Sequence, residues 1–192
     1  KMIPKNLRTV RFETYVKDDD EAMGTQQDGI YGLLDEWHAY YQDMKTSVAL
    51  WSYYRAKPRL TAKQCGTFFS SIDGTLFAHG EFKLYVATAL RHAREKVPAF
   101  YATLLANRAF AQAVRELDAS FGGLIAGYFA AKPGIMAEMK ARGVEVRDEG
   151  EYVYCGDSGT GTNLATWKLL ETALAGSQYT REFAALERGS WQ

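Results

Sequence analysis

The sequence predicts an α+β fold that is dominated by helices and has a few short antiparallel strands, including a hairpin near residues 144–155. Most segments repeat apolar residues at helical spacing, whereas only short stretches alternate as strands do. Hydrophobic residues make up 47% and aromatic residues 14% of the chain, which is enough for a packed core. The length of 192 residues suits a single domain over residues 1–192, either complete or a fragment of a larger protein.

The first predicted strand and helix lie in the N-terminal quarter. Residues 9–17 alternate apolar and polar side chains through Val10 and Phe12, which predicts a strand. After a turn, apolar residues recur every three to four positions, which predicts an amphipathic helix over residues 29–45.

The following segments are less regular. Residues 47–54 fit a strand or a helix equally well, and residues 56–66 have the composition of a loop, with a short helix from Leu60 as the alternative. Residues 67–75 are rich in residues that favour strands and end at an Asp-Gly turn, so a strand is expected here.

The middle of the chain has a helical pattern. Residues 80–117 are expected to form two helices divided at Pro98, because proline suits the first turn of a helix. A further helix is expected over residues 118–131, capped by its first aspartate. Residues 133–143 predict a shorter helix that ends at its final glycine.

The C-terminal part predicts a hairpin followed by two helices. Residues 144–156 alternate on both sides of a turn at residues 148–150, which is the pattern of a β-hairpin. Helices are expected over residues 163–175 and 180–189, with a glycine ending the first.

Charge and cysteine content narrow the function classes. Lys and Arg together number 23, as do Asp and Glu, so the net charge is zero. This balance does not indicate a strongly basic nucleic-acid binder, although a local basic groove is compatible with it. Cys65 and Cys155 lie far apart and lack Cys-x-x-Cys partners, which argues against a disulfide scaffold or a structural zinc site. The opening residues lack an apolar leader and no run is long enough to span a membrane, which predicts a cytoplasmic protein.

The Gly-rich stretch at residues 156–161 has three readings. Its glycines fit the frame of a phosphate-binding loop, but Thr162 stands where that loop needs a lysine. The sequence Gly-Asp-Ser-Gly around Ser158 is found in chymotrypsin-like proteases, which require two β-barrels that a helical chain does not supply. The third reading is a plain strand–turn–helix junction, with Thr160 or Thr162 capping the helix.

Three segments, in the same order, resemble the RNA-dependent RNA polymerases of positive-strand RNA viruses, especially nodavirus-like and picornavirus-like ones. They are "TYVKDD" at residues 14–19, "FFSSIDGT" at residues 68–75 and "CGDSGTGTN" at residues 155–163. These are similar to the fingers segment, the first palm motif and the nucleotide-selecting loop of that family.

The resemblance implies particular roles and partners. Lys17 would contact the nucleoside triphosphate, and Asp73 would be the palm aspartate that senses the ribose 2′-hydroxyl. The partners would be RNA and a nucleoside triphosphate, and the cofactor Mg²⁺. The implied substrate-contacting residues of the Gly-rich stretch are Gly156, Ser158, Thr160 and Asn163.

The chain departs from the family in its metal ligands. Phe68 stands where the first palm aspartate binds metal, and a phenyl ring cannot ligate a hard cation. Acidic residues at 18–21 replace the usual basic ones, and no Gly-Asp-Asp follows Asn163. The metal site is therefore undefined, and this chain alone is not expected to transfer nucleotides.

The alternative is a non-enzymatic viral or phage accessory or structural protein that acts through protein–protein contacts, either with a partner or as a homo-oligomer. The neutral charge, the many aromatic residues and the incomplete catalytic set favour it. Whether the chain is an enzyme stays open between these hypotheses.

A few further residues are candidates for chemistry. His92 and Glu95 share a helix face, so a metal site is one reading of the histidines and a solvated surface is the other. A small basic cluster, which suits either a phosphate contact or a solvated face, consists of Arg91, Arg94 and Lys96. Residues that fit either base stacking or the core are Trp37, Tyr40, Tyr41, Trp51, Tyr53 and Tyr54.

Overall fold

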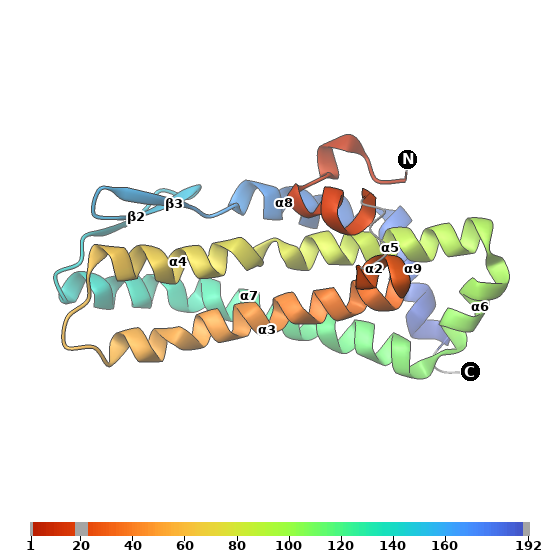
Figure 1. Ribbon diagram of the computed structural model, residues 1–192, viewed down its shortest axis with the longest axis horizontal. Coiled ribbons are helices and arrows are strands. Elements are labelled where there is room, and N and C mark those ends of the chain that lie inside the picture. Colours follow the sequence, from red (N-terminus) through yellow and green to blue (C-terminus); the bar gives the residue numbers. More distant parts are fainter. Residues whose placement is uncertain (1, 18–22, 190–192) are drawn as a thin grey trace.

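The computed structural model describes residues 2–17 and 23–189, and its architecture is an elongated array of helices with one small sheet. Figure 1 shows α3 (Ile30–Arg55), α4 (Ala62–Leu76), α5 (Ala78–Lys96) and α7 (Arg108–Ala141) lying along the long axis. The sheet lies at one end of these helices, and α6 (Pro98–Ala106) lies at the other (Figure 1). The predicted helix-dominated α+β class is confirmed.

Helix α3 extends the helix predicted over residues 29–45. Its buried residues recur at helical spacing through Ile30, Leu33, Trp37 and Met44, and the ambiguous segment 47–54 continues the same helix. This face packs along α4 and α5, and the long contact resolves the ambiguity in favour of a helix.

Helix α4 contradicts the predicted strand at residues 67–75. The Thr61 hydroxyl accepts a hydrogen bond from the Gln64 backbone, and the Gln64 side chain accepts one from the Thr61 backbone, which is a complete capping box. Phe68, Phe69 and Ile72 are fully buried on one helical face. Phe68, which the polymerase resemblance placed at a metal-ligand position, is a core residue in contact with Trp51 and Tyr54.

The helix break predicted at Pro98 is confirmed, but the breaks predicted farther on are wrong. Pro98 begins α6 directly after α5. Helix α7 then continues through Asp118 and Pro133, where a helix start and a break were expected. Proline in a helix interior costs about 3 kcal/mol, and here the apolar contacts of α7 along the array outweigh that cost. The helix stops where predicted, because Gly143 follows it with φ +82°.

The N-terminal segment is helical, so the strand predicted at residues 9–17 is wrong. It contains η1 (Lys5–Leu7), α1 (Val10–Phe12), η2 (Glu13–Lys17) and, further on, α2 (Gly24–Gln27). Phe12 is buried while Val10 is 74% exposed, so the two residues do not share the buried face that alternation implied. The acidic residues at positions 18–21 lie outside the described residues.

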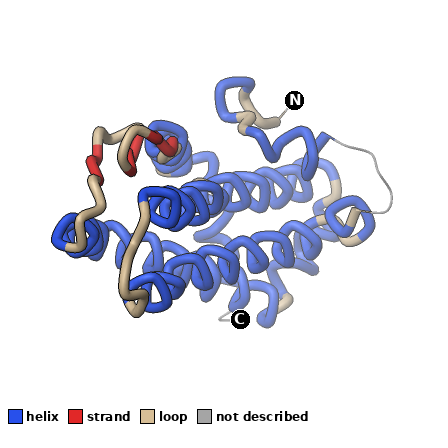
Figure 2. Tube along the Cα trace, turned by 60° about the vertical axis from the view of Figure 1, so that its left-hand side comes forward, coloured by secondary structure: helices blue, strands red, loops and turns tan. Residues whose placement is uncertain are grey.

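The sheet confirms the hairpin predicted at residues 144–156 and adds a third strand. Strands β1 (Val146–Asp148), β2 (Tyr152–Cys155) and β3 (Ser158–Gly161) are antiparallel in that order. Strand β3 lies within the Gly-rich stretch, so that stretch is a second hairpin and not only a turn. Helices α8 (Leu164–Leu174) and α9 (Ser177–Gly189) follow, near their expected positions. Figure 2 shows the strands gathered at one end of the helical array.

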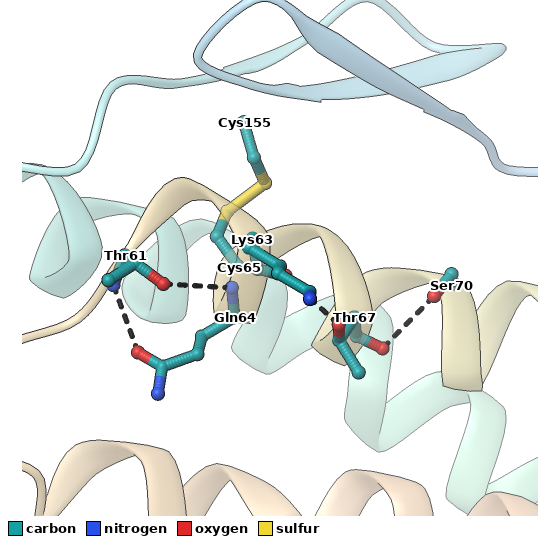
Figure 3. Close-up of a disulfide and its surroundings, with 7 residues drawn as sticks. All are labelled: Thr61, Lys63, Gln64, Cys65, Thr67, Ser70 and Cys155. Atoms are coloured by element: carbon teal, nitrogen blue, oxygen red, sulfur yellow. Dashed lines mark hydrogen bonds between the residues drawn. A yellow bond between two sulfur atoms is a disulfide. The ribbon is translucent and has the colours of Figure 1, made fainter.

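A disulfide between Cys65 and Cys155 attaches the sheet to α4 (Figure 3). The sequence argued against a disulfide scaffold, and this single bond was not anticipated. The two residues are 90 positions apart in sequence, and only the packing of β2 on α4 brings their Cα atoms to 5.9 Å. Disulfides persist mainly in oxidising compartments, so the cytoplasmic location stays a prediction that this bond does not favour.

None of the helices in residues 2–17 and 23–189 combines the length and the apolar character that a bilayer crossing requires.

Replacing both cysteines by alanine should lower the free energy of unfolding by about 2–5 kcal/mol, because the disulfide restricts a long loop of the unfolded chain. Urea denaturation of the Cys65→Ala/Cys155→Ala variant and of oxidised wild type measures the difference. Wild type unfolded under reducing conditions is the control and should match the variant. Equal stability of the oxidised protein and the variant would contradict this role of the bond.

Candidate functional site

The residues that the polymerase resemblance singled out are only partly brought together. Lys17, at the end of η2, forms an exposed ion pair with Glu13, with 2.5 Å between Nζ and Oε2. Asn163 precedes α8 with φ 51°, and its Nδ2 donates a hydrogen bond of 3.3 Å to the backbone oxygen of Asp73. Asn163 and Asp73 therefore meet, whereas Lys17 lies on a separate segment.

The other implied substrate residues lie along α4. Gly156 belongs to the turn between β2 and β3, and Ser158 and Thr160 are in β3, opposite Cys155 and Val153. The large cavities described below are lined by other residues. The kinship with polymerases, like the Mg²⁺ that it implies, stays a prediction from the sequence.

Asp73 lies in a polar cluster between α4, α7 and the sheet, which consists of the buried residues Asp73, Tyr128 and Lys132 and the exposed Asp148. Burial raises the pKa of Asp73 to about 7, with the Lys132 ammonium acting in the opposite direction and the Asp148 carboxylate adding to the rise. Burial, together with Asp73 and Asp148, also raises the pKa of Tyr128. Because its pKa lies near 7, the buried Asp73 carboxyl gains or loses a proton at pH values near neutrality.

The Asp73 cluster joins the sheet to α7. Lys132 is buried, and its Nζ lies 2.7 Å from Oδ2 of Asp148 on β1. Oδ2 of Asp73 and the hydroxyl of Tyr128 find no hydrogen-bond partner among the described residues. Sequence reasoning missed Tyr128, Lys132 and Asp148, although a lysine inside the apolar stretch "YFAAKPGI" was a usable signal.

A second buried group anchors the N-terminal segment. Glu81 of α5 is fully buried, accepts a hydrogen bond from the Thr9 hydroxyl, and lies 2.6 Å from Nη1 of Arg11. Arg11 also donates to the backbone oxygen of Gly74 and lies over the ring of Tyr40. A buried carboxylate requires such partners, so the N-terminal segment is held firmly against α5.

His79 is a structural residue in the core. Its Nε2 lies 2.8 Å from Oδ1 of Asp118, and Lys83 binds the other oxygen of the same carboxylate at 2.7 Å. Burial alone would raise the pKa of Asp118, but the hydrogen bonds from His79 and Lys83 lower it. Within the described residues, no three His, Cys, Asp or Glu side chains gather as metal ligands.

A groove of about 480 Å³ lies between α3 and α7. Each helix contributes a stripe at positions i, i+3, i+4 and i+7, so two parallel faces form its walls. The lining residues, hereafter the α3–α7 groove, are Tyr31, Leu34, Asp35, His38, Tyr41, Ala113, Glu116, Leu117 and Ser120.

The α3–α7 groove is acidic and aromatic. Asp35 and Glu116 are both exposed, and neither forms an ion pair with a described residue. No lysine or arginine is among the lining residues. Tyr31 is 42% exposed, and Tyr41 supplies a second phenol ring. Sequence reasoning named Tyr41 and His38 separately but did not place them on one wall with Asp35.

Comparison with known protein families, with curated protein sequences and with solved structures finds no match of significance for this chain.

Replacing Asp73 by asparagine should remove part of the pH dependence of stability. With its folded-state pKa raised from 3.8 to about 7, Asp73 binds a proton in the folded protein that the unfolded chain releases. Its contribution to stability is therefore full below pH 3.8 and is lost as the pH rises to about 7. Between pH 5 and pH 8, the free energy of unfolding should fall by about 2–3 kcal/mol more for wild type than for Asp73→Asn. Urea denaturation at a series of pH values measures this difference.

The exposed Asp157→Asn variant is the matched control for this measurement and should retain the wild-type pH profile. Identical profiles for Asp73→Asn and wild type would show that Asp73 titrates normally.

Proposed function

We propose that this protein is a non-enzymatic binding protein that recognises a partner protein through the α3–α7 groove. The observation that carries the proposal is the pair of carboxylates, Asp35 and Glu116, on opposite walls of an exposed groove whose described lining includes no lysine or arginine. The groove is built from two long, rigid helices, which favours recognition without a large change of shape.

The chemistry of the groove selects a basic side chain of the partner. An arginine between Asp35 and Glu116 would meet a carboxylate on each side, and charge-assisted hydrogen bonds of this kind are about twice as strong as neutral ones. Its planar guanidinium would also stack on Tyr31, as arginine does more readily than lysine. Lys45 already lies over the ring of Tyr41. Arginine and tyrosine are the residues that most often dominate binding energy at protein interfaces.

Neutralising both carboxylates should weaken partner binding at least about tenfold, because each would lose a charged hydrogen bond at the centre of the contact. The partner is first found by placing a photo-crosslinking amino acid at Ser120 inside the groove and, as a control, at Tyr53, which is 58% exposed and does not line it. The purified partner is then titrated by calorimetry against wild type and Asp35→Asn/Glu116→Gln.

Asp43→Asn is the matched control for that titration, since Asp43 is exposed on the same helix outside the groove. It should bind as wild type does. A partner that binds wild type and the doubly neutralised variant equally would refute recognition through these carboxylates.

RNA binding is a second candidate function, and a basic cavity between α5 and α9 favours it. The cavity has a volume of about 650 Å³ and includes Arg91, Arg94 and Arg181 together with the hydroxyls of Ser177 and Thr180. Arg94 and Arg91 belong to the cluster noted in the sequence. Their charges are partly engaged, since Glu95 contacts both and Glu182 lies 3.0 Å from Nε of Arg94.

If this cavity binds RNA, wild type should bind labelled single-stranded RNA at low salt, with an affinity that falls as salt rises. Arg91→Gln/Arg181→Gln should weaken binding and reduce the slope of log affinity against log salt by about 0.7 for each lost phosphate contact. Arg147→Gln, at an exposed position on β1, is the control. Absence of binding at low salt would eliminate this candidate.

A further inference from the structure

A cavity of about 680 Å³ lies between the N-terminal segment, the start of α3 and the second half of α5. Its wall is largely apolar and includes the buried side chains of Ile3, Phe12, Ile30 and Leu33. This volume is within the range of small-molecule sites, which are typically apolar with a few placed polar groups.

Two threonines that line this cavity have buried hydroxyls without a hydrogen-bond partner among the described residues. Thr25 is only 6% exposed, and its Oγ1 is buried and unpartnered within the described part of the chain. The same is true of Oγ1 of Thr88, which lines the cavity from α5. A buried hydroxyl without a partner costs about 1–3 kcal/mol, so a ligand atom that accepts these hydrogen bonds would recover it.

The position of Thr25 is set by a close contact between α2 and α3. A Cβ atom at Gly32 would lie 2.2 Å from the backbone oxygen of Gly24 and 2.9 Å from Cα of Thr25. Glycine at position 32 therefore permits α2 to pack directly on α3. Thr25 is held in the cavity wall by the fold and does not depend on a flexible loop.

Among the described residues that line the cavity, Arg8 alone carries a permanent charge. Arg8 lines it, stacks over Phe12 with 4.8 Å to the ring centroid, and donates two hydrogen bonds to the backbone oxygen of Ile3. No described carboxylate pairs with Arg8, and none is among the lining residues. The remaining titratable lining groups in the described part of the chain are Tyr15, Tyr85 and the exposed His92, so no described lining residue neutralises the guanidinium.

We propose that this cavity binds a small amphipathic carboxylate, with its apolar chain against Ile3, Ile30 and Leu33 and its carboxylate at Arg8. The unpartnered hydroxyls of Thr25 and Thr88 donate hydrogen bonds to ligand oxygen. A carboxylate fits a guanidinium better than a neutral or cationic head group does, because it accepts two hydrogen bonds in one plane. This site is separate from the α3–α7 groove, and its ligand does not depend on the proposed protein partner.

The test uses three ten-carbon probes below their micelle-forming concentrations: decanoate, 1-decanol and decyltrimethylammonium. Wild type should bind decanoate at least about tenfold more tightly than 1-decanol and should not bind the cation, as a charge-assisted contact predicts. Ala89→Trp, which fills the cavity from α5, should abolish binding of all probes while far-UV circular dichroism stays unchanged.

Arg8 also supports the N-terminal segment, so the decisive quantity is the ratio of the decanoate affinity to the 1-decanol affinity. Arg8→Met should reduce this ratio to about one, and Arg8→Lys should restore most of it. If the substitution only loosened the N-terminal segment, the protein would bind both probes more weakly by the same factor, and the ratio would not change. Thr25→Val, which keeps the shape of the side chain, should weaken the binding of decanoate several-fold.

Several outcomes would overturn the proposal. They are no decanoate binding by wild type, equal affinity for all three probes, and binding that survives Ala89→Trp. Vesicles of phosphatidylglycerol distinguish a lipid surface from a free carboxylate. Binding to vesicles without binding to monomeric decanoate would show that the cavity is not the site.

Discussion

The covalent bond between Cys65 and Cys155 determines how the small sheet lies on the helices. Strands β1 and β3 are both hydrogen-bonded to β2, so they follow Cys155 to the surface of α4. As a result, Asp148 on β1 reaches Lys132 of α7, and Asn163, just after β3, reaches the backbone of Asp73. A shift of β2 by one residue along its own direction would move these groups by about 3 Å and break both contacts. The Asp73 cluster therefore depends on the disulfide.

Buried charged residues also hold separate segments together at other places in the fold. Glu81 holds the N-terminal segment through Arg11, and Glu182 of α9 holds α5 and α6 through Arg94 and Tyr101. A buried charge that lost its partner would cost several kcal/mol, so each contact excludes alternative arrangements of the segments that it joins. Asp73 differs because its Oδ2 has no hydrogen-bond partner among the described residues. Burial raises its pKa to about 7.

Although the net charge is zero, the protein has three surfaces of different chemical character. The groove between α3 and α7 is acidic and aromatic, the cavity between α5 and α9 contains three arginines, and the cavity under the N-terminal segment is apolar with one unneutralised guanidinium. Each is formed by elements distant in sequence, and each suits a different class of ligand. Local separation of charge, and not the total, decides what this protein is able to bind.

The sequence by itself determined those features that act within a few residues. The periodicity of α3 and α5, the break at Pro98, the stop at Gly143 and the hairpin near residues 144–155 all follow from local geometry. The strand predicted at residues 67–75 failed because β propensity was weighed without the capping box at Thr61 and Gln64. Asp73 was named from the sequence, but its neighbours Tyr128, Lys132 and Asp148 were not. Only the tertiary structure decided which residues meet across 60 to 90 positions, because such contacts depend on the packing of whole helices and leave no periodic signal in the chain.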